Sequence, residues 1–157
     1  MGDGSSSMTT YLDAPTDLLG RVGQRLGTTD WMKITQDQVD LFADATGDHQ
    51  WIHSDRNRAA KGPFKGTIAH GYLTLSLTPV VIEQVLQIRE LTAALNYGVN
   101  KVRFPAPVRV GSQVRATVAV MRAEQKTAGL EAEFTLTYEI DGERRPACVA
   151  DVIVLYP

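Results

Sequence analysis

The sequence HGYLTLSLTPVVIEQVLQI occupies residues 70–88 and carries apolar side chains on almost every side. The run is longer than an ordinary strand, and a helix that is apolar all round is one that is buried on most sides. Its one proline, Pro79, lacks an N–H and should bend this helix or end its first half. Because Glu83, Gln84 and Gln87 are also present, the run is not a membrane span. Residues 70–88 are therefore predicted to form a central hydrophobic helix.

The residues that follow this helix alternate between apolar and polar, which is typical of strands with one face in water. Residues 130–140 show the pattern most clearly, and further strands are predicted at 96–104, 114–120 and 147–155. Asp141-Gly142 is a tight-turn dipeptide and should join the last two strands in a hairpin. Helices followed by four antiparallel strands in a meander indicate an α+β protein, with an antiparallel sheet wrapped around the central hydrophobic helix.

A capped helix precedes the central one. Thr35 can satisfy the free N–H groups at a helix start, Gln38 is its capping-box partner three residues later, and Gly47 supplies the stop signal. A shorter amphipathic helix is predicted within residues 11–22, and a short strand at 29–34.

Two stretches lack a hydrophobic period. Residues 48–69 read as an irregular connection with one short helical turn at 54–60, and a connection of this length is most often functional. The first ten residues, MGDGSSSMTT, are rich in glycine and serine. They are expected to be a disordered tail or an expression scar, which leaves residues 11–157 as a single domain.

The composition is that of an ordinary soluble globular protein. Of the 157 residues 43% are apolar and 22% are charged, and 16 basic against 18 acidic residues give a formal net charge of −2. This balance argues against a nucleic-acid-binding protein, which would usually be basic. The single cysteine, Cys148, excludes an internal disulfide and a multi-cysteine zinc site and fits a reducing compartment. No charged-then-apolar signal segment opens the chain, so a cytoplasmic protein is expected.

The densest group of titratable side chains is TGDHQWIHSD, residues 46–55. Asp48 and His53 lie five residues apart, and a loop that returns on itself could bring this carboxylate and imidazole within reach of one water. The simpler alternative is that Asp48 caps a turn and His53 is a hydrogen-bonded core histidine. A metal site built on His49 and His53 would lack a convincing third ligand, so no metal is expected.

The sequence IAHGY, residues 68–72, enters the central helix through Gly71. A glycine there leaves backbone N–H groups open to an anion or a developing oxyanion. The alternative is that Gly71 only relieves crowding where the helix meets the sheet. No phosphate loop, dinucleotide fingerprint or nucleophile elbow occurs in the sequence. A phosphate-bearing ligand could still use basic residues at loops and strand ends, namely Lys61, Lys65, Lys101, Arg103 and Arg109.

These motifs, in this order, resemble the MaoC-like (R)-specific enoyl-CoA hydratase family, whose fold is the hotdog fold. The resemblance runs from about Gly27 to the end of the chain. It rests on three blocks, which are Gly47-Asp48 followed by His53, residues 68–71 at the start of the central helix, and VRFPAPV at residues 102–108. The family commonly has Asn-Pro between its two catalytic residues, where this sequence has Gln50-Trp51.

The resemblance implies the (R)-specific hydration of trans-2-enoyl-CoA to (R)-3-hydroxyacyl-CoA, or the reverse dehydration, in fatty acid metabolism. It assigns the activation of water to Asp48 and His53, and the oxyanion donor to the Gly71 N–H. The further substrate-binding candidates are Gln50, Ser76 and Tyr72. The reaction needs neither a metal nor a cofactor, and its substrate would be an acyl-CoA or an acyl-carrier-protein thioester.

Two other functions fit the same fold. A hotdog acyl-CoA thioesterase shares the acyl-thioester ligand, and a catalytically silent partner subunit could bind that ligand without reacting. The resemblance at Asp48 and His53 favours the hydratase over the thioesterase, and the presence of Asp48, His53 and Gly71 argues against a silent subunit. A homodimer is expected, because an open antiparallel sheet edge is usually covered or paired.

Overall fold

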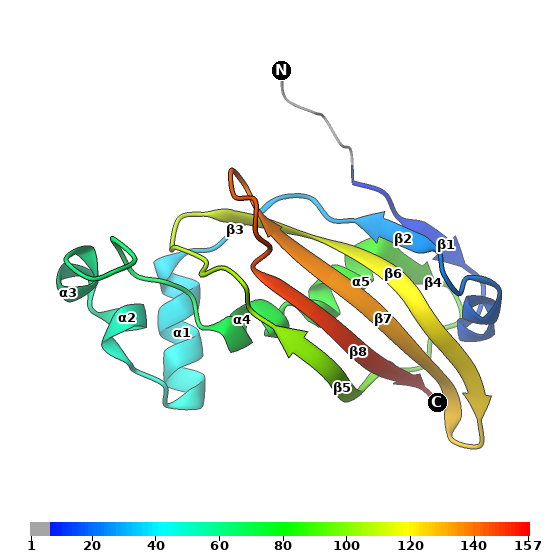
Figure 1. Cartoon of the computed structure of the whole chain (residues 1–157). Helices are drawn as coiled ribbons and strands as arrows, with labels where there is room; N and C mark the ends of the chain where they lie inside the picture. Colours follow the sequence, from blue (N-terminus) through cyan, green and yellow to red (C-terminus); the bar gives the residue numbers. More distant parts are fainter. Residues whose placement is uncertain (1–6) are drawn as a thin grey trace.

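The computed structural model describes residues 7–157, which fold into short helices and a long curved sheet (Figure 1). In chain order the elements are β1 (Thr10–Leu12), the 3-10 helix η1 (Pro15–Gly20), β2 (Arg25–Thr28), β3 (Met32–Lys33), α1 (Gln36–Thr46), α2 (Trp51–Ser54), α3 (Arg56–Ala60), α4 (Gly71–Ser76), α5 (Thr78–Val85), β4 (Leu86–Ile88), β5 (Leu95–Arg103), β6 (Gln113–Lys126), β7 (Gly129–Ile140) and β8 (Cys148–Tyr156).

Among residues 7–157, six strands pair into one antiparallel sheet in the order β2-β6-β7-β8-β5, and β3 also pairs with β6. β1 and β4 form a separate parallel pair. Figure 1 shows the sheet curving over α4 and α5, whose inward side chains pack against it. The α+β prediction, an antiparallel sheet wrapped around a central hydrophobic helix, is confirmed.

The predicted four-strand meander is wrong in its first member. β6, β7 and β8 follow one another as a meander, but β5 pairs with β8, with Val99 opposite Val152. β5 ends at Arg103, and neither Pro105 nor Pro107 has an N–H to donate to a sheet ladder. The chain therefore leaves the sheet after β5 and enters β6 on the other side of β7 and β8.

The connection between β7 and β8 is longer than the two-residue hairpin predicted. Asp141-Gly142 does turn the chain, because Gly142 has φ 81° and the Glu143 N–H donates to Ile140 O at 3.0 Å. β8 begins only at Cys148, however, so the residues after this turn extend the loop.

The central helix is two helices rather than one. α4 and α5 meet at Leu77, and Pro79 lies in the first turn of α5, so the predicted break is confirmed. Leu86–Ile88 form β4 instead of a helical turn, since a short apolar run fits a helix end and a strand equally well. The sheet covers only one side of the pair, and while Val81 is fully buried, Tyr72 is 70% exposed, contrary to the prediction. No helix between residues 7 and 157 is long and apolar enough to cross a membrane.

α1 follows its local sequence signals. Thr35 Oγ1 accepts a hydrogen bond from the Gln38 N–H at 3.2 Å, and the Gln38 side chain accepts from the Thr35 N–H at 2.9 Å. Gly47 adopts φ 81° and ends the helix as predicted. Val39 and Ala43 point inward and are buried, which fixes α1 against the rest of the chain.

Three shorter predictions are displaced. The helix predicted within residues 11–22 is the 3-10 helix η1, which β1 precedes. Of the strand predicted at 29–34, only the two-residue β3 forms, and the longer strand β2 ends before it at Thr28. The turn predicted at 54–60 forms as α3, which begins two residues later at Arg56, and α2 is an additional short helix that ends at Ser54. Pairing with β6 sets the bounds of β2 and β3, and such a long-range contact leaves no local periodicity.

The predicted tail of ten residues is too long. The Met8 N–H donates to Thr28 O at 3.2 Å, and Thr10 begins β1. Residues 1–6 of this predicted tail lie outside the described residues.

Candidate functional site

The loop after α1 presents the Asp48 carboxylate. Gly47 turns the chain out of α1, and Asp48 Oδ1 then accepts from the Gln50 N–H at 3.3 Å. The hydrogen bond expected if Asp48 caps a turn is thus present. The side chain is nevertheless 52% exposed, and its Oδ2 lies 4.0 Å from His70 Nε2. One oxygen therefore shapes the loop while the other faces the buried histidines.

His53 lies on α2, with only 6% of its surface exposed. Its Nδ1 is 2.7 Å from Ile68 O, and because a carbonyl only accepts, Nδ1 donates and Nε2 is the acceptor of the neutral ring. The His53 carbonyl in turn accepts from the Gln36 side chain at 2.8 Å.

The charge state of His53 follows from its surroundings. Burial lowers the pKa of His53, the hydrogen bond to Ile68 O raises it, a positive charge on His70 lowers it, and the Asp48 carboxylate raises it. The net result is a pKa below the ordinary value of 6.5. At neutral pH the ring is therefore uncharged, with a basic Nε2.

His70 is the residue of this site to which the sequence interpretation gave no role. Its ring stacks on that of His53, with centroids 3.8 Å apart and an interplanar angle of 23°. Its Nε2 lies 2.9 Å from Asp48 O, and Phe42 covers the ring at a centroid distance of 4.8 Å. The sequence did hold a signal for a role of His70. Of the three histidines in the chain, His53 lies in residues 46–55 and His70 in residues 68–72, which are the two segments proposed to contain reactive groups.

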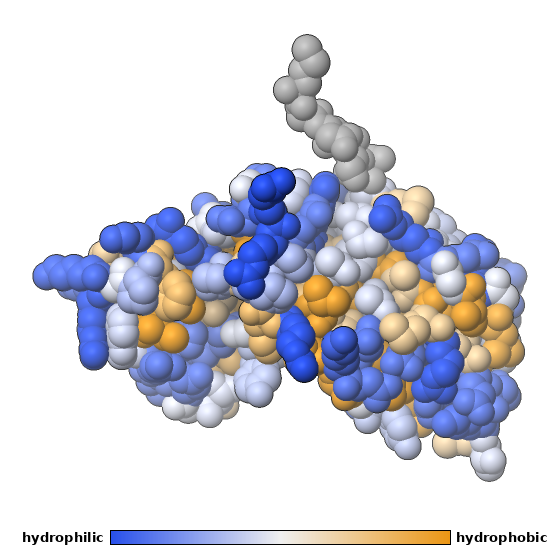
Figure 2. Space-filling view, in the orientation of Figure 1, coloured by the Kyte–Doolittle hydropathy of each residue, from blue (hydrophilic) through white to orange (hydrophobic). Residues whose placement is uncertain are grey.

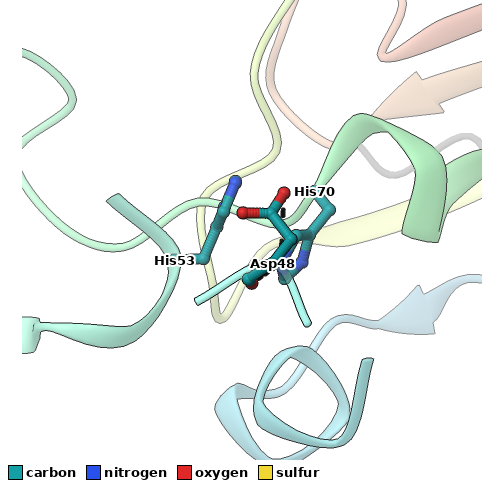
Figure 3. Close-up of side chains that lie close together, drawn as sticks. All are labelled: Asp48, His53 and His70. Carbon is teal, nitrogen blue, oxygen red and sulfur yellow. Dashed lines mark hydrogen bonds and ion pairs between the residues drawn. The ribbon is translucent and has the colours of Figure 1, made fainter. Parts of the chain in front are cut away.

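The three side chains converge at the start of α4 (Figure 3). A carboxylate oxygen of Asp48 and one ring nitrogen each of His53 and His70 all lie within 4.8 Å of one another. A water that makes two hydrogen bonds of about 2.8 Å spans partners that are roughly 4.5 Å apart. The separation of Asp48 and His53 therefore suits one shared water.

The same geometry suits a metal ion poorly. His53 and His70 each use one ring nitrogen on a backbone carbonyl, and the lone pairs of the other two nitrogens lie in nearly parallel ring planes, 23° apart with centroids separated by 3.8 Å. Lone pairs in two such stacked planes do not converge on a common centre. A tetrahedral ion needs donors that converge at about 2.0–2.1 Å. His49, the other histidine of the metal alternative, lies outside the cluster, 57% exposed and 3.7 Å from Asp44.

Gly71 is the first residue of α4, so its N–H has no partner inside the helix. A Cβ at this position would lie 3.1 Å from the Phe104 ring, closer than ordinary packing allows. The crowding alternative therefore has a physical basis here. Relief of crowding and an open N–H are compatible, because both follow from the missing side chain.

The other predicted substrate-binding residues are dispersed. The Gln50 side chain is exposed, and this residue contributes through its carbonyl, which accepts from the His53 N–H at 3.0 Å. Ser76 Oγ donates to Tyr72 O at 2.6 Å. Ser76 also lines a cavity of about 280 Å³ between the central helix and strands β5 and β8, whereas Tyr72 packs edge-on against Phe104.

Comparison with known proteins finds a family and close relatives. The family model "MaoC like domain" matches residues 17–142. The chain is 51% identical over 145 residues to "3-hydroxyacyl-thioester dehydratase Z" of Mycobacterium tuberculosis, covering 92% of this chain and 96% of that protein. It is 45% identical over 142 residues to "Nodulation protein N" of Rhizobium leguminosarum bv. viciae, covering 88% of each.

Solved structures share the architecture. The (R)-hydratase from A. caviae involved in PHA biosynthesis superposes with a TM-score of 0.71 at 26% identity, covering 87% of this chain and 96% of that one. The R-hydratase PhaJ1 from Pseudomonas aeruginosa, in its unliganded form, gives a TM-score of 0.70 at 24% identity, covering 87% of this chain and 81% of that one. The predicted hotdog fold is confirmed.

Proposed function

The chain belongs to the MaoC-like dehydratase family, and we propose that it adds water to C3 of a trans-2-enoyl thioester to give an (R)-3-hydroxyacyl thioester, and catalyses the reverse dehydration. As a member of this family it is an enzyme, a hydro-lyase, and the family resemblance is confirmed. The observation that supports the proposed reaction most directly is the pairing of Asp48 and His53 within reach of one water.

The geometry suggests how the two residues divide the work. Because His53 Nδ1 donates to Ile68 O, His53 Nε2 is the basic atom and takes a proton from the water. The Asp48 carboxylate accepts the second hydrogen bond of that water and orients its oxygen toward C3. As the C–O bond forms, the electron pair of the C2–C3 double bond moves to give an enolate. The proton held on His53 then passes to C2, so the water has been added in full.

The negative charge of the enolate lies on the thioester oxygen. We assign its stabilisation to the Gly71 N–H, which points out of the first turn of α4. A donor placed at such an oxygen contributes about 3–4 kcal/mol to lowering the barrier. Contacts of the thioester and acyl chain with Gln50, Ser76 and Tyr72 belong to the same proposal, and the cavity beside Ser76 supports an acyl chain there.

We further propose that the enzyme is a cytoplasmic homodimer. Large apolar side chains are exposed on the central helix and on or next to the edge strand β5, namely Tyr72, Val80, Leu95, Tyr97, Val99 and Phe104. Figure 2 shows apolar surface on this side, around the place where β5 approaches α4. An apolar face beside an open edge favours pairing with a second copy. Sedimentation should give twice 17.2 kDa, and a mass of 17.2 kDa at micromolar concentration would contradict the dimer.

The activity test follows the absorbance of the enoyl thioester across a series of chain lengths, as CoA and as carrier-protein thioesters, with a thiol reagent in a parallel assay. Hydration removes the conjugated absorbance and leaves the thioester intact. Release of free thiol would instead identify a thioesterase, and unchanged substrate in every case would identify a silent binding subunit.

A further inference from the structure

His70 touches each part of the proposed site. Its Nε2 lies 2.9 Å from Asp48 O, so this nitrogen donates to the main chain of Asp48. Its ring stacks on His53 at 3.8 Å, and Phe42 backs the ring from α1. The next residue is Gly71, so the peptide that joins the two carries the proposed oxyanion donor.

We infer that His70 is a positioning residue of the reaction, and that it holds Asp48, His53 and the Gly71 N–H in one fixed arrangement. The inference rests on the proposed function. The His70 carbonyl accepts from the Leu73 N–H at 3.0 Å, which fixes the plane of the His70–Gly71 peptide, and the N–H of that planar unit is fixed with it. The side chain of His70 therefore holds the acid–base pair, while its main chain directs the oxyanion donor.

Packing alone does not explain this residue. His70 is only 3% exposed, and among the described residues its Nδ1 has no hydrogen-bond partner. An unpaired buried nitrogen opposes folding, and an apolar ring of similar size would fill the same space without that cost. An apolar ring could not, however, donate to Asp48 O.

Two substitutions separate the contacts that His70 makes. His70→Gln keeps an N–H that reaches toward Asp48 O but removes the stacked ring, whereas His70→Phe keeps a ring against His53 but removes the donor. Displacing reacting groups by about 1 Å costs roughly 100-fold in rate. We expect kcat for hydration to fall about 10- to 100-fold in both variants, with KM changed less than about threefold. His49→Gln is the matched control, since it makes the same change at an exposed histidine of the Asp48 loop.

The outcomes are distinct. A loss of kcat at near-constant KM, in variants whose thermal melts show a cooperative fold, supports positioning. If both variants fold and keep kcat within twofold of the wild type, the inference is wrong while the proposed function stands. If His70→Phe does not fold, the smaller and polar His70→Gln carries the same test. A wild-type enzyme that hydrates no enoyl thioester would overturn the proposed function itself, together with this inference.

Discussion

The sheet β6–β8 and the segment from Gly47 to His70 are held together by different forces. In the sheet, inward side chains such as Phe134, Leu136 and Tyr138 are fully buried, and long antiparallel ladders join the strands. In the segment, few apolar side chains are buried, and single hydrogen bonds between side chains and backbone set the geometry.

The difference separates stability from chemistry. A sheet position tolerates any apolar side chain of suitable volume, because the hydrophobic effect is not directional. A position in the segment requires one donor or acceptor at one place, as His53 Nδ1 does opposite Ile68 O. Substitutions in the sheet should therefore reduce the free energy of unfolding and spare the chemistry, whereas substitutions in the segment should act mainly on kcat.

The largest effects are expected at the acid–base pair. Asp48→Asn removes the carboxylate and His53→Gln the titrating ring, and each should lower kcat about 10²–10⁴-fold, the range of general acid–base catalysis. Because both act on one water, the double variant should be little worse than either single one. KM should change much less than kcat. Steady-state kinetics on an enoyl thioester measure all three variants.

Thermal melts must accompany these kinetics. His53 is buried, and its replacement can leave Ile68 O unpaired, which costs about 1–3 kcal/mol of stability. Asp48 is half exposed, so Asp48→Asn should lower the stability less. Near-normal hydration by folded Asp48→Asn would contradict the mechanism, and turn capping through Gln50 would then be the better account of this residue.

The sheet should respond in the opposite way. Leu136 is fully buried, and Leu136→Ala removes apolar contacts and leaves a cavity, so the free energy of unfolding should fall by about 2–5 kcal/mol. Urea denaturation measures this loss, with Thr137→Ala on the exposed face of the same strand as the control, expected within about 0.5 kcal/mol. The kcat of the folded fraction should be unchanged. A large loss of kcat in folded Leu136→Ala would remove the distinction between the two regions.

The same distinction explains which features the sequence could predict. Apolar alternation and the Thr35–Gln38 capping box act over a few residues, and the strands and α1 follow from them. The place of β5 beside β8 depends on where the chain goes after Arg103, which no local period records. The role of His70 was missed for a related reason, because its partners lie 17 and 22 residues away and the contacts exist only in the folded chain.

The pH dependence of the reaction tests the buried setting of His53. Burial is the main cause that lowers its pKa below 6.5, and the neutral ring is the active base in the proposed mechanism. The value of kcat/KM should therefore stay level as the pH falls through 6.5 and decline only at lower pH. In Asp48→Asn the carboxylate that raises the His53 pKa is gone, so the decline should move to still lower pH. A decline that begins above pH 6.5 would contradict a neutral, desolvated His53 as the base.

The smallest effect is expected at His49, which lies in the same loop one residue after Asp48. Its Nε2 is 3.7 Å from Asp44 Oδ1, but the two side chains are 57% and 72% exposed, and exposed ion pairs contribute only about 0–1 kcal/mol. His49→Gln should thus leave kcat within about twofold of the wild type, because a solvated ring neither holds the water nor positions a group that does. If folded His49→Gln instead lost tenfold or more in kcat, activity would depend on every side chain of this loop rather than on the specific hydrogen bonds that His53 and His70 make. The contrast between exposed His49 and buried His53 and His70 would then have no chemical meaning.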